Sequence, residues 1–262
     1  MLTLFLLYLL SLRGRTGHNG LQALRGWRYA HRGLHGQGVP ENSLAAFRKA
    51  FDGGFGIELD VHLMADGTLA VIHDSSLTRT AGADIAIENL TKAELSQYVL
   101  EGTAERIPTL PEVLALCNGR APMIIELKTA KNNQEALCDR VLAPLSDYKG
   151  AFCIESFDPK CVRVLKTKDP KIIRGQLSEN FLRSKPQFMP GSLRFIMTFL
   201  LTNFLTKPDF VAYRFSDWGH ISPWLCRKLW KIQGVAWTIR TAEDLQAAER
   251  KGLLPIFEGF LP

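Results

Sequence analysis

The sequence predicts an α/β protein folded as a (β/α)8 barrel of the TIM type, with a small insertion after the second strand. Short apolar runs that fit β-strands alternate with helical patterns from residue 27 onward, which is typical of a parallel sheet covered by helices. A chain of 262 residues can bury the core of one such domain. An Asp-Gly pair within the series indicates an extra hairpin, which begins the insertion.

The predicted strands are short runs rich in β-branched and other apolar residues. They are Trp27–Ala30, Gly56–Val61, Met123–Leu127, Phe152–Ser156, Ile172–Gln176, Phe210–Tyr213, Val235–Ile239 and Leu253–Phe257. Amphipathic helical patterns separate most of them, for example Leu110–Cys117, Gln134–Leu142, Pro159–Lys166, Pro223–Ile232 and Ala242–Lys251. This alternation predicts parallel neighbours joined by helical crossovers.

The first residues, Met1–Leu12, are almost wholly apolar. Such a run is about half of what a helix needs to cross a bilayer. We favour an N-terminal membrane anchor, with the body of the protein on the cytoplasmic side, over a cleaved signal peptide or a buried helix. The predicted division is an anchor and basic linker over residues 1–25 and a barrel domain over 26–262. The orientation rests on arginines that follow the apolar run, namely Arg13, Arg15, Arg25 and Arg28.

The amino-acid composition indicates which kinds of partner the protein binds. A net charge of +6 and an isoelectric point near 9.1 favour an anionic partner. The sequence has no aromatic RNA-binding motif and no long basic tract, so we expect no nucleic acid partner, and no obligate protein partner is evident. The five cysteines lack metal-ligand spacing and stand among apolar neighbours, which predicts reduced, buried thiols in a cytosolic setting.

The second strand and the run after it form the predicted hairpin. The polar residues of Ile57–His62 alternate with apolar ones and therefore share one face. With Asp66 and Gly67 as a two-residue turn, Asp60 lies directly opposite His73. We expect the insertion that begins here to occupy about residues 63–108.

The segment before this hairpin predicts one strand, loop and helix unit. His31-Arg32-Gly33 stands where the first strand gives way to a loop. Asn42 fits the N-cap of a helix that ends at Gly53-Gly54.

One long segment interrupts the alternation of strands and helices. Residues from about 180 to 207 hold many large apolar side chains between Phe181 and Phe204, with Arg183, Lys185, Arg194 and Lys207 in and around them. The segment is too long for an ordinary loop. It is either a helix that covers the barrel or a basic amphipathic element that docks on a membrane or contacts a lipid substrate.

Four motifs stand in a fixed order within Tyr29–Asp74. They are His31-Arg32-Gly33, Pro40-Glu41-Asn42, Glu58-Leu59-Asp60-Val61 and His73-Asp74. In their order and spacing, the sequence resembles the glycerophosphodiester phosphodiesterase family, and the similarity continues more weakly through nearly the whole chain after residue 26. The resemblance implies a metal-dependent hydrolase that converts glycerophosphodiesters to sn-glycerol 3-phosphate and an alcohol.

The resemblance also implies that Glu58, Asp60 and Glu126 hold one divalent cation. Inward carboxylates on neighbouring strands would repel one another, so a cation should compensate them. Ligands that offer only oxygen suit Mg²⁺ or Ca²⁺ better than Zn²⁺. The alternative is that each carboxylate merely pairs with a nearby arginine or lysine.

His31 and His73 are implied to be the catalytic acid and base, in an order that the sequence does not assign. Imidazole can take a proton from the attacking oxygen and give one to the departing alkoxide near neutral pH. Arg32 and Lys128 are candidates to bind the phosphate, and ion pairing with the carboxylates is compatible with that role. A direct hydrolysis and a route through a cyclic phosphate are both open.

Gln176 and Trp237 lie at or near predicted strand ends and resemble family positions that line the substrate pocket, although Trp237 could equally be a core residue. Glu41 is expected to orient the arginine or the ion. The chain departs from the family near its end, with Arg240 where Asn is frequent and Ile256–Phe260 where a Thr-Asp-x-Pro-like segment is usual. These departures leave the choice of substrate open.

Three other functions stay open. A lysophospholipase D would perform the same chemistry on a lipid with one acyl chain, in keeping with the apolar Phe181–Phe204 segment. A cyclising phospholipase would release a cyclic phosphate. A membrane-tethered binding protein would retain the pocket without turnover. The expected partners are therefore a glycerophosphodiester or lysolipid substrate and a membrane surface.

Overall fold

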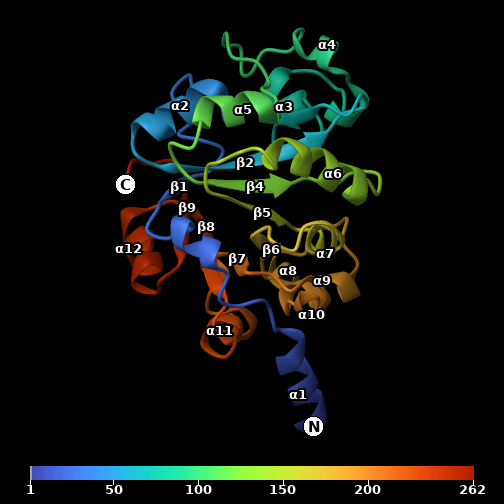
Figure 1. Ribbon diagram of the computed structural model, residues 1–262, viewed down its shortest axis with the longest axis vertical. Helices are drawn as coiled ribbons and strands as arrows, with labels where there is room; N and C mark the ends of the chain where they lie inside the picture. Colours follow the sequence, from blue (N-terminus) through green and yellow to red (C-terminus); the bar gives the residue numbers. More distant parts are fainter. Residues whose placement is uncertain (1) are drawn as a thin grey trace.

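The computed structural model describes residues 2–262 and has a closed barrel of eight parallel strands, which confirms the predicted fold class (Figure 1). The strands pair in the order β1, β2, β4, β5, β6, β7, β8 and β9, and β9 pairs with β1 to close the barrel. Their bounds are β1 (Tyr29–Ala30), β2 (Gly56–Leu63), β4 (Met123–Leu127), β5 (Phe152–Ser156), β6 (Arg174–Ser178), β7 (Phe210–Arg214), β8 (Gln233–Ile239) and β9 (Leu254–Phe257).

Helices on the outside of the barrel connect the strands. They are α2 (Leu44–Asp52), α5 (Leu110–Cys117), α6 (Gln134–Leu145), α7 (Pro159–Lys168), α11 (Ile221–Lys228) and α12 (Ala242–Arg250). All of these helices except α6 begin with a side-chain cap, which satisfies free backbone N–H groups. Thr109 and Glu112 form a capping box on α5, and Thr241 caps α12.

The cap of α2 differs from the prediction. Ser43, not Asn42, accepts a hydrogen bond from the backbone N–H of Ala46 and begins the helix. Asn42 is buried one residue earlier, and its side-chain amide donates to Asp60 Oδ2 at 2.9 Å. The residue that looked like a helix cap therefore supports the loop against the second strand.

The hairpin register is one residue away from the prediction. β3 (Leu69–Val71) runs antiparallel to β2 and pairs Val61 with Val71. The turn has three residues instead of two, because Gly67 adopts a positive φ of 85° and its N–H bonds to the carbonyl of Met64. The backbone partner of Asp60 is consequently Ile72 rather than His73, and the predicted direct opposition is wrong.

The insertion that follows packs around a small core of its own. α3 (Thr78–Ala81), the 3-10 helix η2 (Ile87–Asn89) and α4 (Lys92–Leu95) lie beside the barrel (Figure 1). Their buried side chains form a cluster separate from the barrel core, which includes Met64, Ile72, Leu77, Ile87 and Leu95. The hairpin packs against the insertion through this cluster, because Met64 and Ile72 directly follow β2 and β3.

The long segment between β6 and β7 forms three short helices instead of a single one. They are α8 (Phe181–Ser184), α9 (Gly191–Thr198) and α10 (Asn203–Thr206). Residues with left-handed backbone conformations end α8 at Lys185 and α10 at Lys207. The segment covers one side of the barrel next to α7 (Figure 1).

Apolar side chains fill the half of the barrel at the amino ends of the strands. This interior cluster includes Tyr29, Cys153, Phe210 and Val235. A 3-10 helix, η1 (Asn19–Leu24), adds Leu21 and Leu24 to the same cluster. The packing leaves no room for a side chain at Gly175, where a Cβ would meet the Phe210 ring at 2.1 Å. The polar side chains that point into the barrel therefore lie toward the opposite end, at the carboxyl ends of the strands.

The amino-terminal helix α1 (Leu2–Ser11) projects from the body at one end of the molecule (Figure 1). The hydroxyls of Tyr8 and Ser222 lie 2.9 Å apart, and the indole N–H of Trp230 donates to the carbonyl of Leu9 at 2.8 Å. Among the described residues, no helix is long and apolar enough to cross a membrane. Met1 lies outside the described residues. The five cysteines are free and buried, as expected.

Candidate active site

Three carboxylates meet at the carboxyl ends of β2 and β4. One oxygen from each of Glu58, Asp60 and Glu126 lies within 4.8 Å of the other two. Glu58 and Asp60 are two residues apart on β2, so both point into the barrel, and Asp60 is the register partner of Glu126. All three side chains are buried. The structure thus brings together the residues that the sequence identifies as candidate metal ligands.

Two cations lie against this carboxylate cluster. The ammonium of Lys128 is 3.0 Å from Asp60 Oδ1 and 2.7 Å from Glu126 Oε1. Arg32 places its side-chain Nε 3.5 Å from Asp60 Oδ2, and its backbone N–H donates to Glu58 Oε2 at 3.1 Å. Lys128 and Arg32 are therefore ion-paired with the cluster, and both also lie on the wall of the adjoining cavity.

A fourth buried carboxylate lies next to the three carboxylates of the cluster. Glu155 on β5 is the register partner of Glu126, and its side chain lines the same cavity. Its Oε2 atom is buried and makes no hydrogen bond to the described residues. No sequence motif marks Glu155 as a residue of the site. Its position in the strand is the one sequence signal for it. Glu155 follows Cys153 by two residues, just as Glu126 follows Ile124, and residues two apart on a strand share a face.

The electrostatics of the cluster reflect an excess of negative charge. Burial raises the pKa of Glu58 well above its ordinary value, and Asp60 and Glu126 raise it further. Burial also raises the pKa of Glu126, against the opposing effect of Lys128. Asp60 behaves differently, because Lys128 and neighbouring groups outweigh burial and lower its pKa below the ordinary value.

This donor set fits a hard divalent cation. Every candidate ligand is a carboxylate oxygen, which Mg²⁺ and Ca²⁺ prefer. Four buried carboxylates, with Glu155 included, lie around Arg32 and Lys128, so the fully ionised group carries two uncompensated negative charges. Burial raises the pKa of Glu58, Glu126 and Glu155, and neighbouring carboxylates raise it further, an effect that a bound cation would offset.

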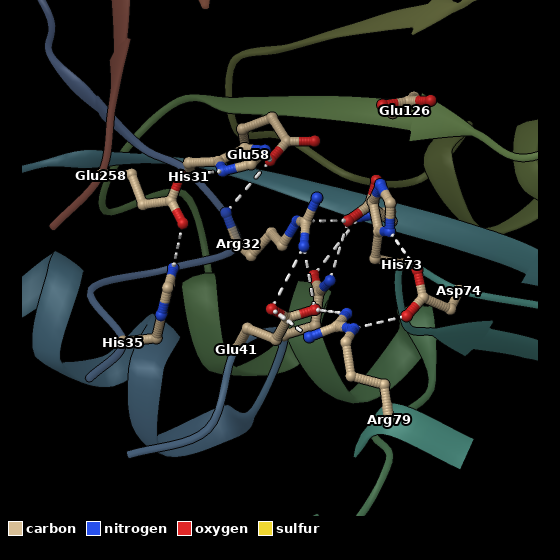
Figure 2. A network of polar contacts seen from close by, with 12 residues as sticks. His31, Arg32, His35, Glu41, Glu58, His73, Asp74, Arg79, Glu126 and Glu258 are labelled. Carbon is tan, nitrogen blue, oxygen red and sulfur yellow. Dashed lines mark hydrogen bonds and ion pairs between the residues drawn. The ribbon is translucent and has the colours of Figure 1, made fainter. Parts of the chain in front are cut away.

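His31 lies beside the cluster and is held by a carboxylate from the last strand. Its Nε2 atom is 3.8 Å from Glu58 Oε2, and its Nδ1 atom is 3.3 Å from Glu258 Oε2. Burial lowers the pKa of His31, and the hydrogen bond to Glu258 opposes that shift. The neutral imidazole is thus favoured near pH 7, as a proton acceptor requires. Figure 2 shows Glu258 next to both His31 and His35.

His73 begins a chain of charged contacts on the other side of the site. Its Nδ1 atom lies 2.6 Å from Asp74 Oδ1, and Asp74 Oδ2 accepts a hydrogen bond from Arg79 at 2.6 Å. Arg79 and Arg32 both bind Glu41, as Figure 2 shows. Glu41 therefore orients the arginine of the site, in the supporting position expected for it. Burial lowers the pKa of His73 as well.

The site opens into a cavity of about 670 Å³ at the carboxyl ends of the strands. Both histidines, Arg32, Lys128, Glu58, Glu126 and Glu155 line it. Its opposite wall is more apolar and includes Phe157, Leu177, Phe215 and Trp237. Trp237 packs edge-on against Phe157 with ring centres 5.5 Å apart, and the Arg214 guanidinium lies 5.4 Å from the Trp237 ring centre.

Gln176 lies away from this cavity. Strand β6 begins two residues later than predicted, and Gly175 and Leu177 are the residues that face the barrel interior. Gln176 therefore points to the other side, where its amide donates to the carbonyls of Ser156, Phe157 and Leu177. The structure gives Gln176 a structural role between strands, and Leu177 lines the cavity instead.

Three further residues of the site escaped the sequence analysis, namely Glu258, Arg79 and Arg214. Glu258 follows the last strand in the segment that departs from the usual family pattern, so no motif identified it. Arg79 belongs to the insertion and reaches Glu41 across 38 residues of sequence. Arg214 ends β7 and carried no signal beyond its place at a strand end.

The comparison with known families agrees with this geometry. A model described as the glycerophosphoryl diester phosphodiesterase family matches residues 31–257. The chain belongs to this family. The match includes every residue of the carboxylate cluster and both histidines, and it ends at the last residue of β9.

Sequence alignments with the following two members of the glycerophosphodiester phosphodiesterase family cover less of the chain than the family model does. A glycerophosphodiester phosphodiesterase of Caldanaerobacter subterraneus subsp. tengcongensis is 33% identical over 56% of this chain and 65% of its own length. A lysophospholipase D of Rattus norvegicus is 32% identical over 46% of this chain and 41% of its own. The alignments thus span less than two thirds of either relative.

A solved structure matches more of the chain. A phosphodiesterase of Oleispira antarctica, in complex with the product sn-glycerol 3-phosphate, has a TM-score of 0.75 and 23% identity. The match covers 93% of this chain and 95% of that one. At 23% sequence identity, this structural similarity shows a shared barrel fold only.

Proposed function

We propose that the protein hydrolyses glycerophosphodiesters to sn-glycerol 3-phosphate and an alcohol with one bound divalent cation, Mg²⁺ or Ca²⁺. The observation that supports this proposal most directly is the meeting of Glu58, Asp60 and Glu126 beside two histidines in one cavity. Membership of the family and the names of its relatives support the same reaction.

In this proposal, Glu58, Asp60 and Glu126 hold the cation. The bound ion would supply a Lewis acid for the phosphoryl oxygens and offset the charge of the cluster. Arg32 and Lys128 bind the remaining phosphoryl oxygens, since a guanidinium and an ammonium are already placed on the cavity wall. The reaction then depends largely on stabilising charge that develops on these oxygens.

His31 and His73 move the protons. Both imidazoles line the cavity, and both have lowered pKa values. Glu258 and Asp74 accept from the Nδ1 side of each ring when that nitrogen carries the proton, which leaves Nε2 free to act on the substrate. Which histidine acts first, and whether a cyclic phosphate forms, are left to experiment.

The second candidate activity is that of a lysophospholipase D. The apolar cavity wall favours it, because Phe157 and Trp237 lie in contact and Phe157 also packs against Phe181 at the start of α8. Phe157 and Trp237 line the cavity, and their side chains could accommodate one acyl chain. The lysophospholipase D relative supports the same chemistry on a larger substrate.

One assay separates these possibilities. The chain is treated with a chelator, and glycerophosphocholine and lysophosphatidylcholine are each supplied with Mg²⁺, Ca²⁺ or Mn²⁺. We expect metal-dependent release of choline from glycerophosphocholine. Faster turnover of lysophosphatidylcholine would establish the second candidate, and an isolated cyclic phosphate would identify a cyclising route. No turnover with any ion and either substrate would overturn the proposed function.

A further inference from the structure

A second hollow lies at the end of the barrel opposite the active site. It is a groove of about 830 Å³ next to the loops that precede β6, β7 and β8. Five basic residues line it, and none of the described lining residues is acidic. We call it the basic groove, and its cations are Arg13, Arg15, Lys166, Arg174 and Lys207.

Two of these cations already bind groups of the protein itself. Arg15 binds Asp209 through two hydrogen bonds of 2.5 Å, and it also donates to the carbonyl of Ile172. Arg174 is buried and donates to the carbonyl of Thr206 at 3.1 Å. The carboxylate of Asp209 is therefore already bound to Arg15, and its negative charge offsets little of the positive charge on the other three cations.

Arg13, Lys166 and Lys207 form no ion pair with the described residues. Arg13 lies 5.5 Å from the ring centre of Trp230. Lys166 and Lys207 each donate to one backbone carbonyl and keep further N–H donors for a ligand. Burial lowers the pKa of Lys166 and of Lys207, and neighbouring cations lower it further.

An exposed apolar surface adjoins the basic groove. It consists of side chains from α1, α9, α10 and the turn between α9 and α10, and we call it the apolar face. Leu4 is 70% exposed and Phe204 is 50% exposed, and both line a shallow hollow that is almost wholly apolar. An exposed patch of large apolar side chains on a soluble domain indicates an interaction surface.

The sequence joins the apolar face directly to the groove. Helix α1 ends at Ser11, two residues before Arg13, and α10 ends at Thr206, immediately before Lys207. The apolar helix α1 and the short helix α10, which carries Phe204, thus lead into two of the uncompensated cations. Figure 1 shows α1 at the opposite end of the molecule from α3 and α4 of the insertion. Apolar side chains beside basic ones are the pattern of segments that lie in a membrane interface.

We propose that the apolar face rests in the surface of a membrane and that the basic groove binds the phosphate of an anionic phospholipid headgroup. A soluble anion would account for the cations but not for the aliphatic and aromatic side chains next to them. The sequence prediction of an N-terminal anchor is thereby extended to a second, headgroup-binding contact. The proposal does not depend on the proposed reaction, because the groove and the catalytic cavity share no lining residue.

Sedimentation with vesicles tests the proposal. The full chain is mixed with vesicles of phosphatidylcholine alone or of phosphatidylcholine with phosphatidylglycerol, and the bound fraction is measured. We expect tighter binding to the anionic vesicles. The double variant Lys166→Ala/Lys207→Ala should bind them roughly tenfold or more weakly, since each basic side chain contributes appreciably near an anionic surface, and it should keep the weaker binding to phosphatidylcholine.

The matched control is Arg48→Ala/Lys92→Ala, which removes the same charge from exposed positions on α2 and α4. It should bind like the unmodified chain. A third variant, Leu4→Ser/Phe204→Ser, should lose binding to both kinds of vesicle. Thermal unfolding of each variant verifies that the fold is retained.

Three results would overturn the proposal. Equal binding to neutral and anionic vesicles would refute the headgroup site, as would equal effects of the groove and control substitutions in folded variants. Release of bound chain by inorganic phosphate at low concentration would show that the groove binds a soluble anion. Self-association that buries the apolar face, without any vesicle binding, would show that a second copy is the partner.

Discussion

Glu258 Oε2 lies 3.3 Å from Nδ1 of His31, so the residue that follows the last strand holds the imidazole that follows the first. The contact is possible because β9 pairs with β1 and closes the barrel. It directs Nε2 of His31 toward the carboxylate cluster, where Glu58 is 3.8 Å away. Barrel closure thereby fixes the orientation of a proposed catalytic group.

Replacing Glu258 with Gln should lower kcat for glycerophosphocholine by roughly 10- to 100-fold, because the imidazole loses the charged partner that sets its tautomer and orientation. KM should change little, since Glu258 does not line the catalytic cavity. Steady-state kinetics separate the two constants. Glu249→Gln, at a surface ion pair with Arg28, is the control. An unchanged kcat would exclude this positioning role.

His31→Ala and His73→Ala should each lower kcat by roughly 100-fold or more, because each removes a proposed proton-transfer group. Binding of the divalent cation should persist, since neither histidine belongs to the carboxylate group. Turnover and calorimetric titration with Ca²⁺ measure the two effects. His18→Ala, outside the site, should retain turnover. Undiminished hydrolysis by either active-site variant would refute the assignment.

Asp60→Asn and Glu126→Gln should each weaken cation binding roughly tenfold or more, because affinity for a hard ion depends on the number of charged oxygen ligands. The rise in melting temperature that Ca²⁺ or Mg²⁺ gives the unmodified chain should shrink accordingly. Asp84→Asn, at an exposed position in the insertion, serves as the control. Equal thermal shifts in all four proteins would place the ion elsewhere.

Trp237→Ala should raise KM by roughly tenfold with a smaller effect on kcat, because it removes apolar contact area from the cavity wall without touching the proton-transfer groups. Comparing glycerophosphocholine with lysophosphatidylcholine shows whether the acyl chain uses this wall. Trp224, exposed on α11, offers the matched Trp224→Ala control. Identical KM values for Trp237→Ala and the unmodified chain would make Trp237 a core residue only.

Glu88→Gln should destabilise the protein by about 1–3 kcal/mol at pH 7, because buried His62 loses a charged partner 2.6 Å away. Burial raises the pKa of Glu88, but hydrogen bonds from His62 and Ser75 outweigh it and lower the value to about 2. A lowered carboxyl pKa stabilises the fold above the ordinary value of 4.5, and this contribution is lost as the pH falls toward 2.

The melting temperature of Glu88→Gln should therefore lie below that of the unmodified chain at neutral pH and approach it as the medium is acidified. Thermal unfolding followed by circular dichroism at several pH values measures the difference. Glu101→Gln, exposed in the same insertion, should show no comparable deficit. A deficit that is constant from pH 7 to acid would mean that Glu88 acts through packing rather than charge.

Local periodicity predicted much of the barrel and part of the site. The alternation in Glu58, Leu59 and Asp60 places both carboxylates on one face, and the same rule turns Glu126 inward on β4. These positions follow from the geometry of a strand, which depends only on neighbouring residues. Parity also explains why Gln176 lies outside the cavity, because Gly175 and Leu177 face the barrel interior and the residue between them must point the other way.

Tertiary structure alone decided which distant groups meet. A left-handed Gly67 shifted the hairpin register by one residue and moved His73 away from direct opposition to Asp60. Closure of the barrel brought Glu258 to His31, and the folded insertion brought Arg79 to Glu41. Such contacts join residues far apart in the chain, so no short-range pattern encodes them. The basic groove has the same origin, because its cations come from the segment after α1, from α7, from the start of β6 and from the residue after α10.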